Sequence, residues 1–398
     1  MIAHDLVEEA RTLLPGAVAL RRRLHRQPEL GLELPATQQA VLEALDGLPL
    51  EVETGRRTTS VLATLTGGRP GPTILLRGDM DALPLREDTG LEFASTVDGC
   101  MHACGHDAHV AMLAGAARLL AGRRDELPGR VLFMFQPGEE GHFGARVMLE
   151  EGLLERDHPP CAAFAIHAVP TIRAGTIATR PSALLASSDD FAITIHGRGG
   201  HASMPHDALD PIPIACEIVQ ALQTYVTRRV NAFEPAVLTV AHITAGTTFN
   251  VIPEVATMRG TIRTVSEATR KQVVGDVRGL VEGIAWAHGA SAELQLWEGY
   301  PVTANDGDFA RFALGVAREL LGERRGVELP NAFMGAEDFS YVLDRLPGAM
   351  VFLGVRPAGA TRPAPNHSNR MVLDEDAMAT GIAMHAAIAS SWLRDAAS

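Results

Sequence analysis

Hydrophobic and polar positions along the first part of the chain alternate between two kinds of pattern. Apolar residues recur with helical spacing over residues 6–25, 36–47 and 105–123. Continuous apolar runs typical of buried strands lie between and after these segments, at residues 72–81, 129–141 and 161–169. Strands that alternate with helices form a mainly parallel sheet with helices on both faces, so we expect an α/β domain here.

The pattern changes near residue 187. From there to residue 298 the predicted order is strand, helix, strand, strand, helix, strand, which is the order of a ferredoxin-like α+β domain. The predicted helices are residues 210–229 and 266–289, and the predicted strands are "DDFAITIHGRGG" and residues 236–245, 255–265 and 290–298.

Helix and strand alternation resumes after this region, with a strand at 348–355 and a helix at about 375–395. We therefore predict an α/β domain formed by residues 1–186 and 299–398, interrupted by a smaller inserted domain at 187–298.

Composition limits the class of protein. The 398 residues are 46% hydrophobic and 21% charged, as in globular proteins, and no apolar run reaches the roughly 20 residues that span a bilayer. The start "MIAHDLVEEARTLLPG" has acids where a signal peptide has a basic segment, so we expect a cytoplasmic protein that binds no membrane. A net charge of −13 argues against nucleic acid as a partner.

Lysines and cysteines exclude further classes. Lys271 is the only lysine, which rules out a Walker A phosphate loop with its Gly-Lys pair. The four cysteines include no Cys-x-x-Cys pair, and we expect no disulfide framework in a large chain without an export signal.

Acidic and imidazole side chains follow the predicted strands of the α/β domain. Asp79 and Asp81 end the first run, Glu139 and Glu140 follow the second, and His167 ends the third. Ligands of open α/β sheets bind at the carboxyl ends of the strands, so we expect these groups at one edge. Each of these residues also has a simpler explanation when it is taken alone. The aspartates could be turn residues, the glutamates could be solvated, and His167 could be a histidine of the core. Their convergence predicts a metal site instead.

The stretch "MHACGHDAH" at 101–109 allows several chemistries. His102 and His106 are four residues apart, but a helical zinc-protease motif lacks its glutamate here and Gly105 would interrupt the helix. A Cys104 nucleophile with a histidine base remains open. The nearby carboxylates favour Cys104 and His106 as metal ligands. Two distant histidines add candidates: His367 in "PAPNHSN" and His201 in "HASMPH", the latter otherwise a surface loop.

These residues resemble a family of dinuclear metallopeptidases and amidohydrolases that includes aminoacylases, hippurate hydrolases, auxin-conjugate hydrolases and thermostable carboxypeptidases. The resemblance covers nearly the whole chain, through "RRLHRQPELGLE", "LLRGDMDALPL", "MHACGHDAHVAMLAGAA", "FQPGEEGHFGARVMLEEG", "GRGGHASMPH", "FNVIPEVATMRGTIRT", "MGAEDFS" and "NHSNRMVLDEDAM". The Cys-x-His pair is similar to that of the hippurate and auxin-conjugate branch.

The resemblance implies roles for individual residues. Two divalent metal ions, Mn²⁺ or Zn²⁺ with Co²⁺ or Ni²⁺ as further candidates, would be held by five ligands: Cys104, His106, Glu140, His167 and His367. Glu139 would be the general base and Asp81 would support it. Asp79 stands where sister branches have a metal-binding histidine, so its role stays open. His201 would stabilise the oxyanion in a partner subunit, which implies a homodimer, or a larger dimer-based assembly, through the inserted lid domain.

Asn250, Arg263 and Gly335 match positions that bind the substrate in the family. The guanidinium of Arg263 suits a free α-carboxylate. We therefore expect a metal-dependent amidohydrolase that cleaves N-acyl-L-amino acids such as hippurate-like, N-acetyl or N-benzoyl amino acids. The alternatives are a carboxypeptidase or dipeptidase of the same family, a cysteine-dependent hydrolase, and a non-catalytic binding homologue.

Overall fold

The computed structural model describes residues 2–397, which form two compact units. The first unit comprises residues 1–184, 304–331 and 338–398, and the second comprises residues 185–303 and 332–337. The second unit thus begins close to the predicted insertion, ends five residues later than predicted, at Thr303, and also takes in the short segment 332–337.

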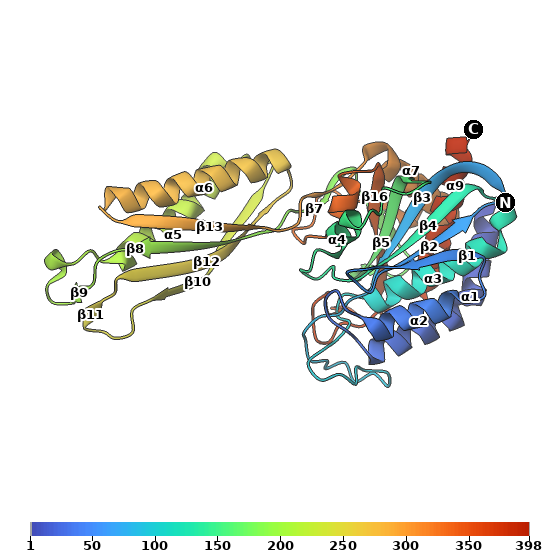
Figure 1. The fold of residues 1–398 in the computed structure, drawn as a ribbon, viewed down its shortest axis with the longest axis horizontal. Helices are drawn as coiled ribbons and strands as arrows, with labels where there is room; N and C mark the ends of the chain where they lie inside the picture. Colours follow the sequence, from blue (N-terminus) through green and yellow to red (C-terminus); the bar gives the residue numbers. More distant parts are fainter. Residues whose placement is uncertain (1, 398) are drawn as a thin grey trace. The chain divides into compact units, whose positions relative to one another are not determined.

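The first unit contains an eight-stranded sheet (Figure 1). In spatial order its strands are β1 (Leu50–Thr54), β2 (Val61–Thr66), β4 (Pro128–Gln136), β3 (Arg69–Asp79), β5 (Pro160–Arg173), β16 (Gly348–Arg356), β6 (Ile177–Thr179) and β15 (Gly326–Glu328). The central strands β4, β3, β5 and β16 are parallel, whereas β1 and β2 are antiparallel additions at one edge. The expected mostly parallel sheet is therefore confirmed in its centre.

Seven α-helices belong to this unit within residues 2–397: α1 (Ile2–Arg26), α2 (Pro35–Leu45), α3 (His106–Gly122), α4 (Gly144–Glu150), α7 (Gly307–Leu321), α8 (Ser340–Leu343) and α9 (Ala377–Ala397). Short 3₁₀ turns lie at Arg124–Glu126 and Glu323–Arg325. Helices α1, α3 and α9 contact one another, and α3 and α9 contact β3. Helix α3 is rich in alanine and leucine and is buried along nearly its whole length, so it belongs to the core.

The second unit has the predicted order of elements. It contains β8 (Asp189–His196), α5 (Pro211–Arg229), β10 (Ala236–Ala245), β12 (Val255–Thr264), α6 (Glu267–Ala287) and β13 (Ser291–Glu298). The four strands form an antiparallel sheet in the order β10-β12-β8-β13, and an apolar core of its own lies between this sheet and the helices. Its remaining elements are β9 (Gly200–His201), a 3₁₀ turn at Pro205–Asp207 and β11 (Val251–Ile252).

A separate two-stranded pair is formed by β7 (Ser182–Leu185) and β14 (Thr303–Asn305). Among residues 2–397, no helix combines the length and apolarity that a membrane span requires.

A buried histidine in α9 links the stability of the first unit to pH. The ring of His385 lies edge-on against Phe164 with the centroids 5.5 Å apart, and its Nδ1 has no hydrogen-bond partner among the described residues. Burial lowers the pKa of His385 from 6.5 to about 3. The folded unit therefore accommodates the neutral ring, whereas the unfolded chain takes up a proton below pH 6.5.

We expect stability to fall as the pH decreases from 6.5 toward 3, with His385 contributing up to about 1.4 kcal/mol per pH unit. His385→Leu should remove this contribution and flatten the dependence of the unfolding free energy on pH in that range. Urea unfolding at several pH values measures the unfolding free energy and hence its slope with pH. Equal slopes for the wild type and the variant would contradict this account, whatever the offset between them at pH 7.

Candidate metal centre

The carboxyl ends of the central strands bring the acidic residues of the first unit together. Asp79 is the last residue of β3, and the turn after β4 carries Glu139 and Glu140. The carboxylate of Asp81 accepts two backbone N–H bonds, from Glu139 to Oδ1 and from Glu140 to Oδ2, both at 2.9 Å. One aspartate therefore fixes the backbone of both glutamates.

The predicted ligand His106 is held by the same segment. Its Nδ1 lies 2.8 Å from the backbone carbonyl oxygen of Asp81, which can only accept, so Nδ1 donates and Nε2 is the nitrogen that carries the lone pair in the neutral ring. This Nε2 lies 3.3 Å from Oδ2 of Asp79 and 4.0 Å from Oε1 of Glu140. An imidazole oriented by a carbonyl in this way is the usual arrangement of a metal ligand.

Gly105 explains how Cys104 and His106 come to one place. It adopts φ +91°, a left-handed conformation that a side chain disfavours, and α3 begins directly after it at His106. A Cβ at this position would also lie 3.3 Å from the Cβ of Ala168. As the sequence predicted, the glycine interrupts the helix between His102 and His106: Cys104 lies before α3, and His106 is its first residue.

His167 faces Cys104. It lies inside β5 and not at the end of that strand as predicted, but the pairing of β3 with β5 stops at Arg77 and Ala165, so His167 projects beyond the paired end of β3. Its Nδ1 donates to the carbonyl oxygen of Ala168 at 3.0 Å, and its Nε2 lies 3.4 Å from Sγ of Cys104.

His367 reaches the cluster from a long loop. Strand β16 ends at Arg356, so this histidine is not just beyond a strand end as predicted, but within residues 357–376, which form neither helix nor strand. Its Nε2 lies 3.2 Å from Oε1 of Glu140. All five predicted ligands, together with Glu139 and Asp81, thus belong to one cluster.

The donor atoms fit a metal ion. Among residues 2–397, five overlapping groups of side chains have ligand atoms within 4.8 Å of one another, and three of them consist only of predicted ligands and Glu139: Cys104, His106 and His167; Cys104, Glu140 and His367; and His106, Glu139 and Glu140. Nε2 of His106 and Oε1 of Glu140 are buried and form no hydrogen bond among the described residues. A buried polar atom without a hydrogen bond destabilises the folded protein unless a bound group, such as a metal ion, interacts with it.

The electrostatics of the cluster also favour a cation. Burial by itself would lower the pKa of His106, yet the Asp79 carboxylate and the Cys104 thiol raise it well above 6.5. Burial raises the pKa of the Cys104 thiol, so the thiolate needs a nearby positive charge. Thiolate, imidazole and carboxylate donors together match divalent transition metals.

The open role of Asp79 is clarified by its partners. The backbone N–H of Ala168 donates to Nε2 of His109, so the opposite nitrogen of that ring donates to Oδ1 of Asp79 at 2.5 Å. Oδ2 of Asp79 accepts from Nη1 of Arg77 at 2.7 Å, and the side chains of Asp79, Arg77 and His109 are buried. Both nitrogens of His109 are therefore engaged, and the ring orients Asp79. The sequence alone left open whether His109 tunes the cluster or only packs beside it.

Asp107 is hydrogen bonded to α1, and the ring of His102 lies 6.3 Å from that of His25 in the same helix. Asp107 accepts from Arg21 at 3.0 Å and from His25 at 2.8 Å. Burial opposes a charge on His25, but the Asp107 carboxylate raises its pKa to about 9. Burial lowers the pKa of His102 to about 4. Neither residue belongs to a group of candidate ligands among the described residues.

The predicted residues of the second unit lie in two places within it. His201 in β9 pairs with Val251, and the N–H of Ala202 donates to the carbonyl of Asn250, so His201 and Asn250 line a common hollow of about 540 Å³. Arg263 in β12 donates to the carbonyl of Met334 at 3.4 Å, next to Gly335.

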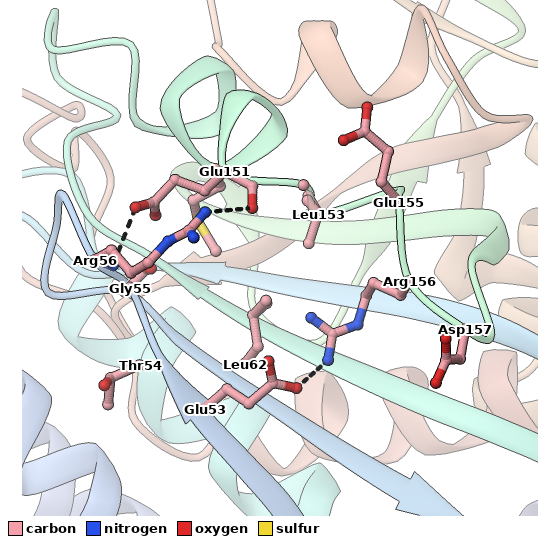
Figure 2. A pocket seen from close by; sticks show the side chains of 13 residues that line it. Glu53, Thr54, Gly55, Arg56, Leu62, Glu151, Leu153, Glu155, Arg156 and Asp157 are labelled. Carbon is pink, nitrogen blue, oxygen red and sulfur yellow. Dashed lines mark hydrogen bonds and ion pairs between the residues drawn. The ribbon is translucent and has the colours of Figure 1, made fainter.

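A further cavity, of about 650 Å³, lies in the first unit beside the β1–β2 hairpin (Figure 2). Two of its arginines have partners in the cavity wall: Arg156 pairs with Glu53, and the guanidinium of Arg56 donates to the backbone carbonyl of Glu151. It contains no residue of the metal cluster.

The sequence and fold have recognisable relatives. The model of peptidase family M20/M25/M40 matches residues 75–391. Thermostable carboxypeptidase 1 of Saccharolobus solfataricus is 38% identical over 97% of this chain and 98% of its own. N-acetylcysteine deacetylase of Bacillus subtilis is 39% identical over 91% of this chain and 92% of its own.

Solved structures agree with this assignment. The Bacillus subtilis YXEP protein, a dinuclear metal binding peptidase from the M20 family, superposes with a TM-score of 0.84 and 35% identity, covering 96% of this chain and 99% of that one. The chain therefore belongs to peptidase family M20/M25/M40 and is a metal-dependent hydrolase of amide bonds.

Proposed function

We propose that this protein hydrolyses the amide bond of N-acyl-L-amino acids, with Glu139 as the general base. The observation that carries the proposal is the cluster itself: thiol, imidazole and carboxylate donors from five residues meet beside a buried glutamate that is fixed by Asp81. N-acetylcysteine deacetylase, which is similar to this protein over 91% of the chain, is named for a substrate of this kind.

The cluster is proposed to hold two divalent ions, Mn²⁺ or Zn²⁺, because two groups of candidate ligands share Cys104. The remaining proposed ligands are His106, His167, Glu140 and His367. When bound, such ions would lower the pKa of a water molecule and polarise the scissile carbonyl.

The side chains then perform the proton transfers. Glu139 takes a proton from the attacking water and delivers it to the leaving nitrogen. Asp81 acts as a positioning residue, because its two oxygens are occupied by the N–H groups of Glu139 and Glu140. Direct attack by Cys104 is disfavoured, since burial raises the pKa of its thiol.

The second unit is proposed to serve as a lid and dimerisation domain. Arg263 binds the substrate α-carboxylate with Asn250 and Gly335, and His201 stabilises the oxyanion in a partner subunit. The edge strand β10 supports a homodimer, because its outer edge has no partner strand among the described residues and the Ile243 on it is 51% exposed. A carboxypeptidase activity is the second candidate, supported by the similarity to thermostable carboxypeptidase 1.

Replacing the base should separate catalysis from metal binding. Glu139→Gln removes the proton acceptor but preserves size, so we expect kcat to fall by about 10²- to 10⁴-fold while bound metal is retained. Steady-state kinetics and elemental analysis of the same sample measure both. Glu155→Gln is the control, an exposed glutamate outside the cluster. Turnover within tenfold of wild type for Glu139→Gln would refute its role.

Metal removal should abolish hydrolysis reversibly. After chelation and dialysis we expect no cleavage of N-acetyl or N-benzoyl amino acids, and recovery with added Zn²⁺, Mn²⁺ or Co²⁺, because both ions are needed for water activation. Undiminished activity in metal-free protein would overturn the proposal. Mass spectrometry during turnover should find no acyl group on Cys104; a trapped thioester would instead establish the thiol mechanism.

Arg263 should bind the α-carboxylate of the substrate. Arg263→Met should lower kcat/KM for N-acetyl amino acids roughly 10- to 100-fold, the usual loss of a charged hydrogen bond, and lower it little for their C-terminal amides. Arg259→Met, on the same strand and exposed, is the control. Equal losses on both substrates would contradict carboxylate recognition, and faster hydrolysis of peptides than of acyl amino acids would favour the carboxypeptidase.

A further inference from the structure

The loop that carries His367 is attached to the cluster by its neighbour, Asn366. The side-chain nitrogen Nδ2 of Asn366 donates to the carbonyl oxygen of Cys104 and to that of Ala168, each at 3.1 Å. The N–H of His367 donates to the carbonyl of Ala103 at 2.8 Å. Both amide hydrogens of Asn366 therefore have a carbonyl acceptor.

The two carbonyls belong to segments that carry other proposed ligands. Cys104 is itself one of them, and Ala168 directly follows His167. The Ala168 oxygen also accepts from Nδ1 of His167 at 3.0 Å, and this bond sets the orientation of the imidazole. Asn366 and His167 thus share one acceptor, so the position of that carbonyl couples the loop to the ring.

The backbone at His367 needs such support. Its φ of +65° is left-handed, which few residues other than glycine adopt. Non-glycine residues keep this conformation where surrounding contacts impose it, and functional sites are where they concentrate. No helix or strand includes residues 357–376, so hydrogen bonds from the loop have to supply that constraint.

We propose that Asn366 is a positioning residue that sets the spacing of Cys104, His167 and His367, and thereby the affinity of the cluster for metal. The inference rests on the proposed metal centre. Asn366 contacts neither substrate nor reacting water in this account; it acts through two backbone carbonyls, through a contact of Nδ2 with Sγ of Cys104 at 3.9 Å, and through the conformation of His367.

The test uses Asn366→Asp in the full-length protein. The substitution is isosteric but places an acceptor oxygen opposite two carbonyl oxygens, so both bonds are lost and replaced by repulsion. Asn369→Asp is the matched control: it makes the same change in the same loop, and its side chain has no contact with the cluster among the described residues. Asn366→Ser removes the amide without adding a charge.

The readouts are the Zn²⁺ dissociation constant from competition with a chromophoric chelator, and the thiolate-to-Co²⁺ charge-transfer band of Co²⁺-loaded protein. We expect both Asn366 variants to bind Zn²⁺ about 10- to 100-fold more weakly and to show an altered band, as for other groups that orient metal ligands, while Asn369→Asp stays within twofold of wild type. Thermal unfolding of metal-free protein identifies variants that have lost the fold.

Folded Asn366→Ser with wild-type Zn²⁺ affinity and an unchanged Co²⁺ band would overturn the proposal. If Asn366→Asp does not fold, Asn366→Ser decides the question alone, and failure of both variants to fold would show a purely structural role and also overturn it. A wild-type protein that binds no metal would instead refute the metal centre itself, so the two failures are distinguishable.

Discussion

The site depends on Asp81, the second residue after β3. The carboxylate of Asp81 accepts the N–H groups of Glu139 and Glu140, and its backbone carbonyl accepts Nδ1 of His106. One residue thus ties the turn after β4 to the first turn of α3. Because β3 and β4 are parallel neighbours, their carboxyl ends meet at the same edge of the sheet. Asp81 and the two glutamates therefore lie close together although they are far apart in the sequence.

A layer of buried charge surrounds this arrangement. On one side Arg77 neutralises Asp79 and His109 donates a hydrogen bond that orients it, and on the other Arg21 and His25 hold Asp107. Buried carboxylates are tolerated only when they are paired and hydrogen bonded. These pairs bring the acidic residues into the interior while keeping neighbouring ligand atoms, such as Nε2 of His106, available.

Much of this organisation could be predicted from the sequence. Continuous apolar runs identified β3, β4 and β5, and helical periodicity identified α1, α3 and α9. Short edge strands such as β1 and β15 were missed because brief, mostly exposed segments carry little periodic signal. The role of Asn366 was equally hidden, because its partner Cys104 lies 262 residues away and nothing local marks the contact. The partners of His109 likewise come from separate strands.

The origin of the ligands along the chain has a consequence for biosynthesis. Cys104 and His367 lie on opposite sides of the second unit in sequence, since residues 185–303 are inserted between them. During synthesis the early segments emerge and fold first. A nascent chain that ends before residue 360 can form strands β3, β4 and β5, yet it lacks the last histidine and the asparagine beside it. The complete cluster therefore arises only after both units have been made, so the second unit is already present when the last candidate ligand is added.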